Sequence, residues 1–171
     1  MIEQVLTIGA YGFSEETFHQ ALHSAGVDLF IDIRARRGMR GSVFAFANAT
    51  RLTAALDAAG IRYVHAKELA PTEAVRDAQR RADAAAGVTK RERTRLGEAF
   101  VSAYRRGCLA RFDPRAFASS YIRDSRRPVL FCVEREPDAC HRSLVAPELA
   151  TALGVPVVNL GPTGGGRTSA R

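Results

Sequence analysis

Long uninterrupted apolar runs are missing from this sequence of 171 residues. A helix that spans a bilayer needs about 18–20 consecutive apolar residues, so the sequence argues against a transmembrane protein and predicts no membrane partner. The segment Met1–Gln4 holds no basic stretch followed by an apolar one, so no signal peptide is expected. The chain also contains no internal repeat.

Cysteine is scarce as well, since the chain has only Cys108, Cys132 and Cys140. This small, odd number disfavours the disulfide framework of a secreted domain and favours a cytoplasmic location. A domain of this length buries roughly two-thirds of its unfolded surface and needs no disulfide or metal in order to fold. Hydrophobic residues at 46% and charged residues at 25% are ordinary globular values, which excludes a disordered or fibrous chain.

Lysine is the third scarce residue. Lys67 and Lys90 are the two lysines among 25 basic residues, so arginine supplies nearly all the positive charge of a chain with net charge +7. Arginine binds phosphate with two parallel hydrogen bonds and stacks on bases, so we expect nucleic acid or a nucleotide as the partner. Between Arg76 and Arg127 lie fourteen basic and six acidic residues, which form either a solvated helical face or a nucleic-acid surface.

Short apolar runs alternate with helical patterns along the chain. Strands are expected at residues 5–9, 29–33, 61–64, 129–133 and 156–160, with helices in the intervals between them. This alternation predicts an α/β fold with a mostly parallel, Rossmann-like sheet in a single three-layer domain over residues 1–160. The domain carries an extra helical insertion at about residues 71–124, and residues 161–171 are expected to form a disordered tail.

Ligands bind beyond the carboxyl ends of the strands in such sheets, which directs attention to residues 9–12, 32–41, 63–69 and 134–142. The last of these follows a buried strand and enters a helix, and it carries Cys140, His141 and Arg142 near the helix N-terminus. Free amides there favour anions and lower the pKa of a thiol. We expect Cys140 and His141, with Glu134, to supply nucleophilic and acid–base groups, and Arg142 to clamp a phosphate.

The same residues allow two other interpretations. Cys132, Glu134, Cys140 and His141 are also the residue types that hold zinc or iron, although the spacing is not C-x-x-C, and nothing in the sequence requires a cofactor. Without chemistry, Cys140 is a buried cysteine and His141 a capping residue.

The second segment is a basic loop that directly follows a strand. Arg34, Arg36 and Arg37 are expected to bind phosphate or substrate, and Asp32 at the strand end is expected to act as a catalytic base. The alternative is a solvated loop in which Asp32 is tied to Arg34 structurally.

Two further residues are candidates for the wall of a ligand pocket. Tyr11 lies in a glycine-bounded turn after the first strand, and His65 lies at the end of the third. The turn does not match G-x-G-x-x-G, so no dinucleotide site is expected. Phe44 and Phe46 are expected to pack in the core rather than stack on a base.

The chain resembles the bacterial and archaeal domain-of-unknown-function 488 family over about residues 4 to 160. The segments that carry the resemblance are Thr7–Gly9, Asp32–Arg34, Gly60–His65, Cys132-x-Glu134 and Cys140–Ser143. Where many members have histidine and serine after the first glycine, this chain has Ala10 and Tyr11. The resemblance implies a compact α/β fold with a site built from these loops, and it supplies no activity.

Three functional hypotheses follow from these residues. The first is an enzyme of the hydrolase or transferase kind that acts on a nucleic acid or nucleotide. The second is a non-catalytic nucleic-acid-binding module. The third is a metal-assisted enzyme that acts on a small anionic metabolite.

Overall fold

Five short apolar segments form the parallel part of one sheet in this computed structural model, which describes residues 1–162 and 167–168. The strands are β1 (Val5–Ile8), β2 (Leu29–Asp32), β3 (Arg62–His65), β4 (Pro128–Phe131) and β5 (Val157–Leu160). Every residue of β1, β2 and β4 is buried, as expected of central strands covered on both faces. A sixth strand, β6 (Arg167–Thr168), pairs antiparallel with β5.

Six α-helices connect and cover these strands. They are α1 (Glu15–Ser24), α2 (Ala49–Ala58), α3 (Glu73–Ala86), α4 (Glu98–Gly107), α5 (Pro114–Phe117) and α6 (Arg142–Leu153). Short 3-10 turns occupy Ala45–Ala47, Lys67–Leu69, Leu109–Arg111 and Pro137–Ala139, and α5 continues as a π-helical segment over Ala118–Ile122.

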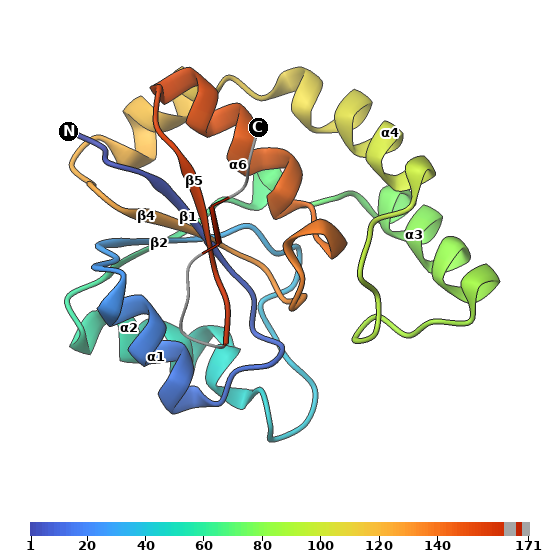
Figure 1. The fold of residues 1–171 in the computed structure, drawn as a ribbon, viewed down its shortest axis with the longest axis horizontal. Coiled ribbons are helices and arrows are strands. Elements are labelled where there is room, and N and C mark those ends of the chain that lie inside the picture. Colours follow the sequence, from blue (N-terminus) through green and yellow to red (C-terminus); the bar gives the residue numbers. More distant parts are fainter. Residues whose placement is uncertain (163–166, 169–171) are drawn as a thin grey trace.

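The strand order β3-β2-β4-β1-β5-β6 places β1 and β4 side by side in the middle of the sheet. From β1 the chain moves to β2 and β3 through α1 and α2, which lie on one face (Figure 1). From β4 it moves in the opposite direction to β5 through α6, which lies on the other face. Right-handed crossovers require this change of face. The chain therefore leaves β1 and β4 at the same edge of the sheet and continues to opposite faces. The predicted α/β fold is confirmed.

Local capping signals mark the ends of several helices. Ser14 and Thr17 form a capping box at the start of α1, and the Asp113 side chain accepts hydrogen bonds at the start of α5. Gly87 ends α3 in the left-handed conformation, with φ of 65°. Asn48 occupies the N-cap position of α2, but its side-chain oxygen accepts from the Met39 amide in the basic loop instead of capping the helix.

The segment predicted as a helical insertion contains α3, α4 and α5. Its inner face is anchored by Tyr104, which is fully buried and donates a hydrogen bond from its hydroxyl to the carbonyl of Leu69 at 2.6 Å. Figure 1 shows α3 and α4 beside the end of the domain at which α6 begins. Residues 88–97 join α3 to α4 without regular structure and are called the 88–97 loop below.

Two further expectations concern the tail and the membrane. Of the tail predicted to be disordered, the structure describes residues 161–162 and the short strand β6, and residues 163–166 and 169–171 lie outside the described part. Among the helices of the described part, none combines the length and the apolar character that crossing a membrane demands.

The start of β4 depends on Asp28, which precedes β2. Its carboxylate accepts hydrogen bonds from the backbone amides of Arg126 and Arg127, at 2.7 and 3.2 Å, and from the Ser125 hydroxyl. Burial raises the pKa of this carboxyl, but these hydrogen bonds outweigh burial and hold the pKa below its ordinary value.

We predict that Asp28→Ala lowers the melting temperature by several degrees at pH 7, since losing hydrogen bonds to a charged group costs about 1–3 kcal/mol. Because the folded-state pKa is lowered, the stabilisation is present above the unfolded pKa and is lost as pH falls. The difference from wild type should therefore shrink between about pH 5 and pH 3 in thermal melts. The control is Asp124→Ala, at an exposed position, and an equal effect of both variants at pH 7 would contradict the assignment.

Candidate active site

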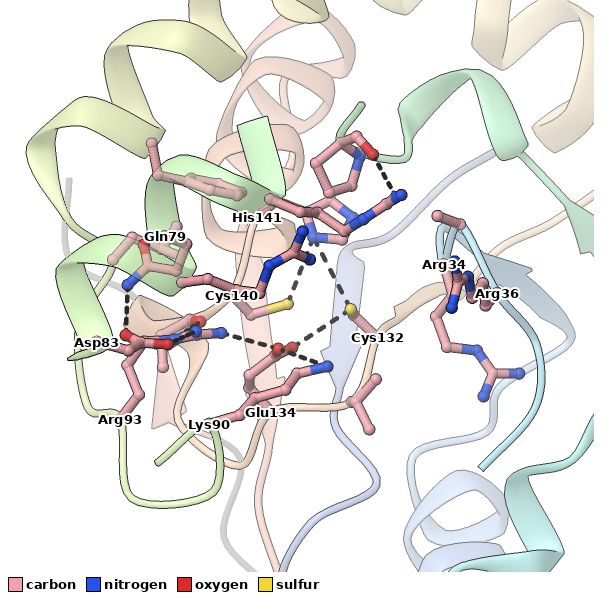
Figure 2. Close-up of a pocket in the computed structure, with 18 of the residues that line it drawn as sticks. Arg34, Arg36, Gln79, Asp83, Lys90, Arg93, Cys132, Glu134, Cys140 and His141 are labelled. Carbon is pink, nitrogen blue, oxygen red and sulfur yellow. Dashed lines mark hydrogen bonds and ion pairs between the residues drawn. The ribbon is translucent and has the colours of Figure 1, made fainter. Parts of the chain in front are cut away.

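A cavity of about 670 Å³ lies at the carboxyl edge of the sheet. Its walls come from the loops after β1, β2 and β4, from α3 and from the 88–97 loop (Figure 2). Eight cationic side chains line it, namely Arg34, Arg36, Arg40, Arg76, Arg80, Lys90, Arg91 and Arg93. The lining carboxylates are three, namely Glu73, Asp83 and Glu134. The cavity therefore carries an excess of positive charge.

The loop after β1 is pressed against the loop after β4. The backbone amides of Ala10 and Tyr11 both donate to the carbonyl of Val133, at 3.0 and 2.9 Å. A Cβ atom on Gly9 would lie 1.9 Å from the carbonyl oxygen of Glu134. The glycine is thus required by close backbone approach rather than by an unusual φ, and it determines where Glu134 lies.

Cys132, Cys140 and His141 form a buried cluster in the cavity wall (Figure 2). His141 Nδ1 lies 3.8 Å from Cys132 Sγ and 3.8 Å from Cys140 Sγ. The three side chains are 5%, 1% and 5% exposed, so they meet one another largely without competing water. The sequence analysis named Cys140 and His141 as reactive groups and Cys132 with them as a possible metal ligand. Cys132 reaches the cluster because β4 ends one residue before it.

The His141 ring is oriented by the backbone of a different loop. Its Nε2 lies 3.0 Å from the carbonyl oxygen of Ile33, just after β2. A carbonyl only accepts, so Nε2 carries a proton and Nδ1 is the atom that faces the two sulfur atoms.

The surroundings shift the pKa values of the two thiols in opposite directions. Burial raises the pKa of Cys140, but a hydrogen bond from Cys132 and the charges of Arg142 and His141 outweigh it and bring that pKa well below its ordinary value. The hydrogen bond to Cys140, together with burial, raises the pKa of Cys132. Burial lowers the pKa of His141, but the charge and hydrogen bond of Cys140 raise it overall. Cys140 is therefore the more acidic thiol of the pair.

Glu134 joins this cluster to the helical insertion. Its Oε2 lies 3.4 Å from Cys132 Sγ, and its Oε1 accepts from Arg93 at 2.9 Å and lies 3.4 Å from Lys90 Nζ. Arg93 also pairs with Asp83 of α3 at 2.7 Å. Burial lowers the pKa of Lys90, but Glu134 and its neighbours raise it overall, so the ammonium stays charged.

Asp32 and Arg34 form a buried pair, which is the structural alternative considered for this loop. Arg34 donates from Nε and Nη2 to the two Asp32 oxygens, at 2.9 and 2.7 Å, and from Nη1 to the carbonyl of Ala47. The Tyr63 hydroxyl donates to Asp32 at 2.9 Å. Arg34 reaches the cavity wall, Asp32 does not line it, and the donors of Arg34 are directed into the protein.

Three other predicted residues lie outside the cavity lining. Arg142 is 1% exposed and donates to the carbonyls of Glu134 and Arg135 at 2.7 and 3.0 Å, so it shapes the loop after β4 from behind. His65 Nε2 lies 2.9 Å from the carbonyl of Arg34. Arg37 is exposed, and a hydrogen bond with Tyr63 raises the pKa of its guanidinium.

Arg36, which the sequence predicted, lines the cavity together with Arg40 and Arg91, and none of the three is ion-paired with a carboxylate of the described residues. The Arg91 guanidinium lies over the rings of Tyr11 and Phe44, 5.5 and 5.4 Å from their centres. Tyr11 thus lines the cavity as predicted, whereas Phe44 and Phe46 are buried in the core as predicted.

Sequence reasoning missed Arg40 of the basic loop and the charged and polar lining residues of the insertion, among them Gln79, Asp83, Lys90, Arg91 and Arg93. Their charges resemble those of a solvated helical face. The one local signal is Gly87, which reverses the chain so that the loop after α3 returns over the cavity.

The fold and this site define a three-layer α/β protein with a cationic ligand cavity at the carboxyl edge of its sheet. The family model described as Domain of unknown function DUF488 matches residues 14–149, and the chain belongs to that family. Comparison with curated proteins and with solved structures finds no match.

We predict that Gly9→Ala destabilises the protein by more than about 1–3 kcal/mol, the usual cost of overpacking, because the clash is with a backbone carbonyl that cannot rotate away. The measurement is the free energy of unfolding in urea. Gly38→Ala is the matched control, since the nearest atom to its Cβ is Asn48 Oδ1 at 4.0 Å. If the two variants were equally stable, the close approach of the two loops would be wrong.

Proposed function

We propose that this protein is an enzyme that binds a nucleotide in the cationic cavity and acts on it at the Cys132–Cys140–His141–Glu134 cluster. The observation that supports this most directly is the meeting of a buried thiol–imidazole cluster and three arginines without carboxylate partners in one cavity. The reaction class is hydrolysis or group transfer on a phosphate-containing substrate.

The anion-binding side of the proposal rests on Arg36, Arg40 and Arg91. Arg34 and Arg93 are committed to Asp32, Asp83 and Glu134, so they position the loops rather than bind substrate. A guanidinium with free donors binds phosphate with two hydrogen bonds. Three of them in one cavity favour a ligand with several phosphate oxygens.

The size and lining of the cavity favour a single nucleotide over a smaller anion. A volume of about 670 Å³ lies within the usual range for small-molecule and cofactor sites. Tyr11 lines the cavity, and the Arg91 guanidinium lies 5.5 Å from the centre of its ring. A flat base can stack on an aromatic ring or on the plane of a guanidinium.

The reacting side rests on Cys140. A thiolate is both a strong nucleophile and a soft metal ligand. In either role of Cys140, the substrate would react next to this side chain. Cys140 lies two residues before the first residue of α6, at the end of the helix where the macrodipole favours negative charge. Asp32 is left out of this role because Arg34 and Tyr63 occupy its oxygens.

A non-catalytic nucleic-acid-binding module receives less support. Several arginines of the basic run are already ion-paired, namely Arg76, Arg80, Arg93, Arg126 and Arg127. The remaining positive charge on those helices does not explain why a thiolate is buried at a cavity.

We predict that Arg36→Gln, Arg40→Gln and Arg91→Gln combined weaken nucleotide binding at least tenfold, because each lost charged hydrogen bond is worth about 1.5–3 kcal/mol. The measurement is calorimetric titration with AMP, ADP and ATP, repeated with short single-stranded DNA and RNA. The control combines Arg106→Gln, Arg115→Gln and Arg123→Gln, which removes the same charge from exposed positions outside the cavity lining. Equal weakening by the two triple variants would point to a diffuse basic surface instead.

We also predict that Cys140→Ala abolishes turnover of the bound nucleotide while nucleotide affinity stays within threefold. Phosphorus NMR and mass spectrometry of nucleotide mixtures detect loss of the starting nucleotide whatever product forms. Cys108→Ala is the matched control, since Cys108 is a half-buried thiol outside the cavity lining. Turnover that persists in folded Cys140→Ala would remove Cys140 from the reaction.

A further inference from the structure

We infer that Cys132, Cys140 and His141 form a zinc site that opens into the cavity. The inference deepens the proposed function, because it concerns the same cluster and names a cofactor for it. It is carried by the positions of two sulfur atoms and one nitrogen atom, which all lie within 4.8 Å of one another.

The spacing of these atoms approaches that of a tetrahedral site. Zinc binds sulfur at about 2.3 Å and imidazole nitrogen at about 2.0–2.1 Å, which puts sulfur and nitrogen ligands roughly 3.5 Å apart. Nδ1 of His141 lies 3.8 Å from each of the two sulfur atoms. The two sulfur–nitrogen distances need to contract by a few tenths of an ångström. The two sulfur atoms lie within 4.8 Å of each other and need to approach to roughly 3.8 Å to share one ion.

The histidine is prepared for this role by its other nitrogen. Nε2 is hydrogen-bonded to the carbonyl of Ile33 at 3.0 Å, which leaves Nδ1 directed at the sulfur atoms. Histidines that bind metal usually donate their second N–H to a carbonyl or carboxylate in this way, which fixes both tautomer and ring orientation. The ring also packs 5.5 Å from the buried ring of Tyr104.

Hydrogen bonds from Arg142 position the backbone next to the proposed ligands. Arg142 binds the carbonyls of Glu134 and Arg135 from behind, at 2.7 and 3.0 Å. The donor set of two sulfur atoms and one nitrogen suits zinc and disfavours magnesium and calcium, which take oxygen ligands.

The fourth coordination position faces the cavity. Glu134 contacts Cys132 at 3.4 Å, but it lies outside the group of mutually close ligand atoms, and its other oxygen is bound by Arg93 and Lys90. Structural zinc sites have four protein ligands, whereas catalytic sites have three and keep one position for water or substrate. The three proposed protein ligands therefore match a catalytic zinc site, and Glu134 is the carboxylate that contacts one of them, Cys132.

The test begins with the full chain after dialysis against a chelator, titrated with Co²⁺ and then with Zn²⁺. We expect one Co²⁺ per chain, the absorption of tetrahedral cobalt with a thiolate charge-transfer band, and loss of both signals on adding one equivalent of Zn²⁺. Folding of the metal-free protein is followed by circular dichroism. Absence of cobalt absorption in folded protein, or absorption without the thiolate band, would overturn the inference.

Variants then identify the ligands. Cys132→Ser, Cys140→Ser and His141→Ala should each weaken Co²⁺ binding at least tenfold, and Cys108→Ser should leave it unchanged. Glu134→Gln should keep the tetrahedral cobalt absorption and the thiolate band, since the carboxylate is not a ligand. If Glu134→Gln removed binding, or if the double variant Cys132→Ser/Cys140→Ser kept the thiolate band, the assigned ligand set would be wrong.

The outcomes separate this inference from the proposed function. Nucleotide affinity is measured on the zinc-free protein, where it depends on the cavity arginines. Cobalt binding without nucleotide binding would leave the zinc site standing and contradict the proposed function. Nucleotide turnover by protein that binds no metal would contradict the zinc site and leave Cys140 as the nucleophile.

Discussion

The hydrogen bond between His141 and the carbonyl of Ile33 connects two parts of the sheet edge that the chain itself separates. It ties the start of α6 to the end of β2 and decides which ring nitrogen faces Cys132 and Cys140. Without this hydrogen bond the imidazole is free to rotate, and Cys140 loses the neighbouring group that helps to lower its pKa relative to that of Cys132. The geometry of the whole reactive cluster depends on a backbone acceptor that belongs to neither the cysteines nor the helix.

Glu134 connects the core of the domain to the helical insertion, and the contacts of both parts depend on this carboxylate. One oxygen contacts the Cys132 thiol, and the other is held by Arg93 and Lys90 of the 88–97 loop. Arg93 reaches further to Asp83 of α3 and to the carbonyl of Ala139. The insertion and the reactive cluster thus share one carboxylate, so displacement of the 88–97 loop changes the charge next to the thiols.

The fold was predictable because its signals are local. Apolar runs produce the strands, Ser14 and Asp113 cap their helices, and Gly87 ends α3. Cys140, His141 and Glu134 were predictable because parallel strands bring their carboxyl ends to one edge. The sequence did not reveal which arginine of the basic loop is buried. Arg34 is held by Asp32 and the Ala47 carbonyl, whereas Arg36, two residues later, carries the same side chain without these contacts. Contacts such as Arg93 with Glu134 join residues 41 positions apart and leave no trace in a periodic pattern.

The residues of the cavity divide by origin. The reactive side chains belong to one continuous stretch, residues 132–142, whereas the unpaired arginines come from the loop after β2 and from the insertion. Under the proposed function, the groups that react and the groups that bind the ligand are therefore encoded in separate segments of the sequence. Sequence changes confined to the 71–124 region would then alter which ligand the cavity admits and leave residues 132–142 unchanged.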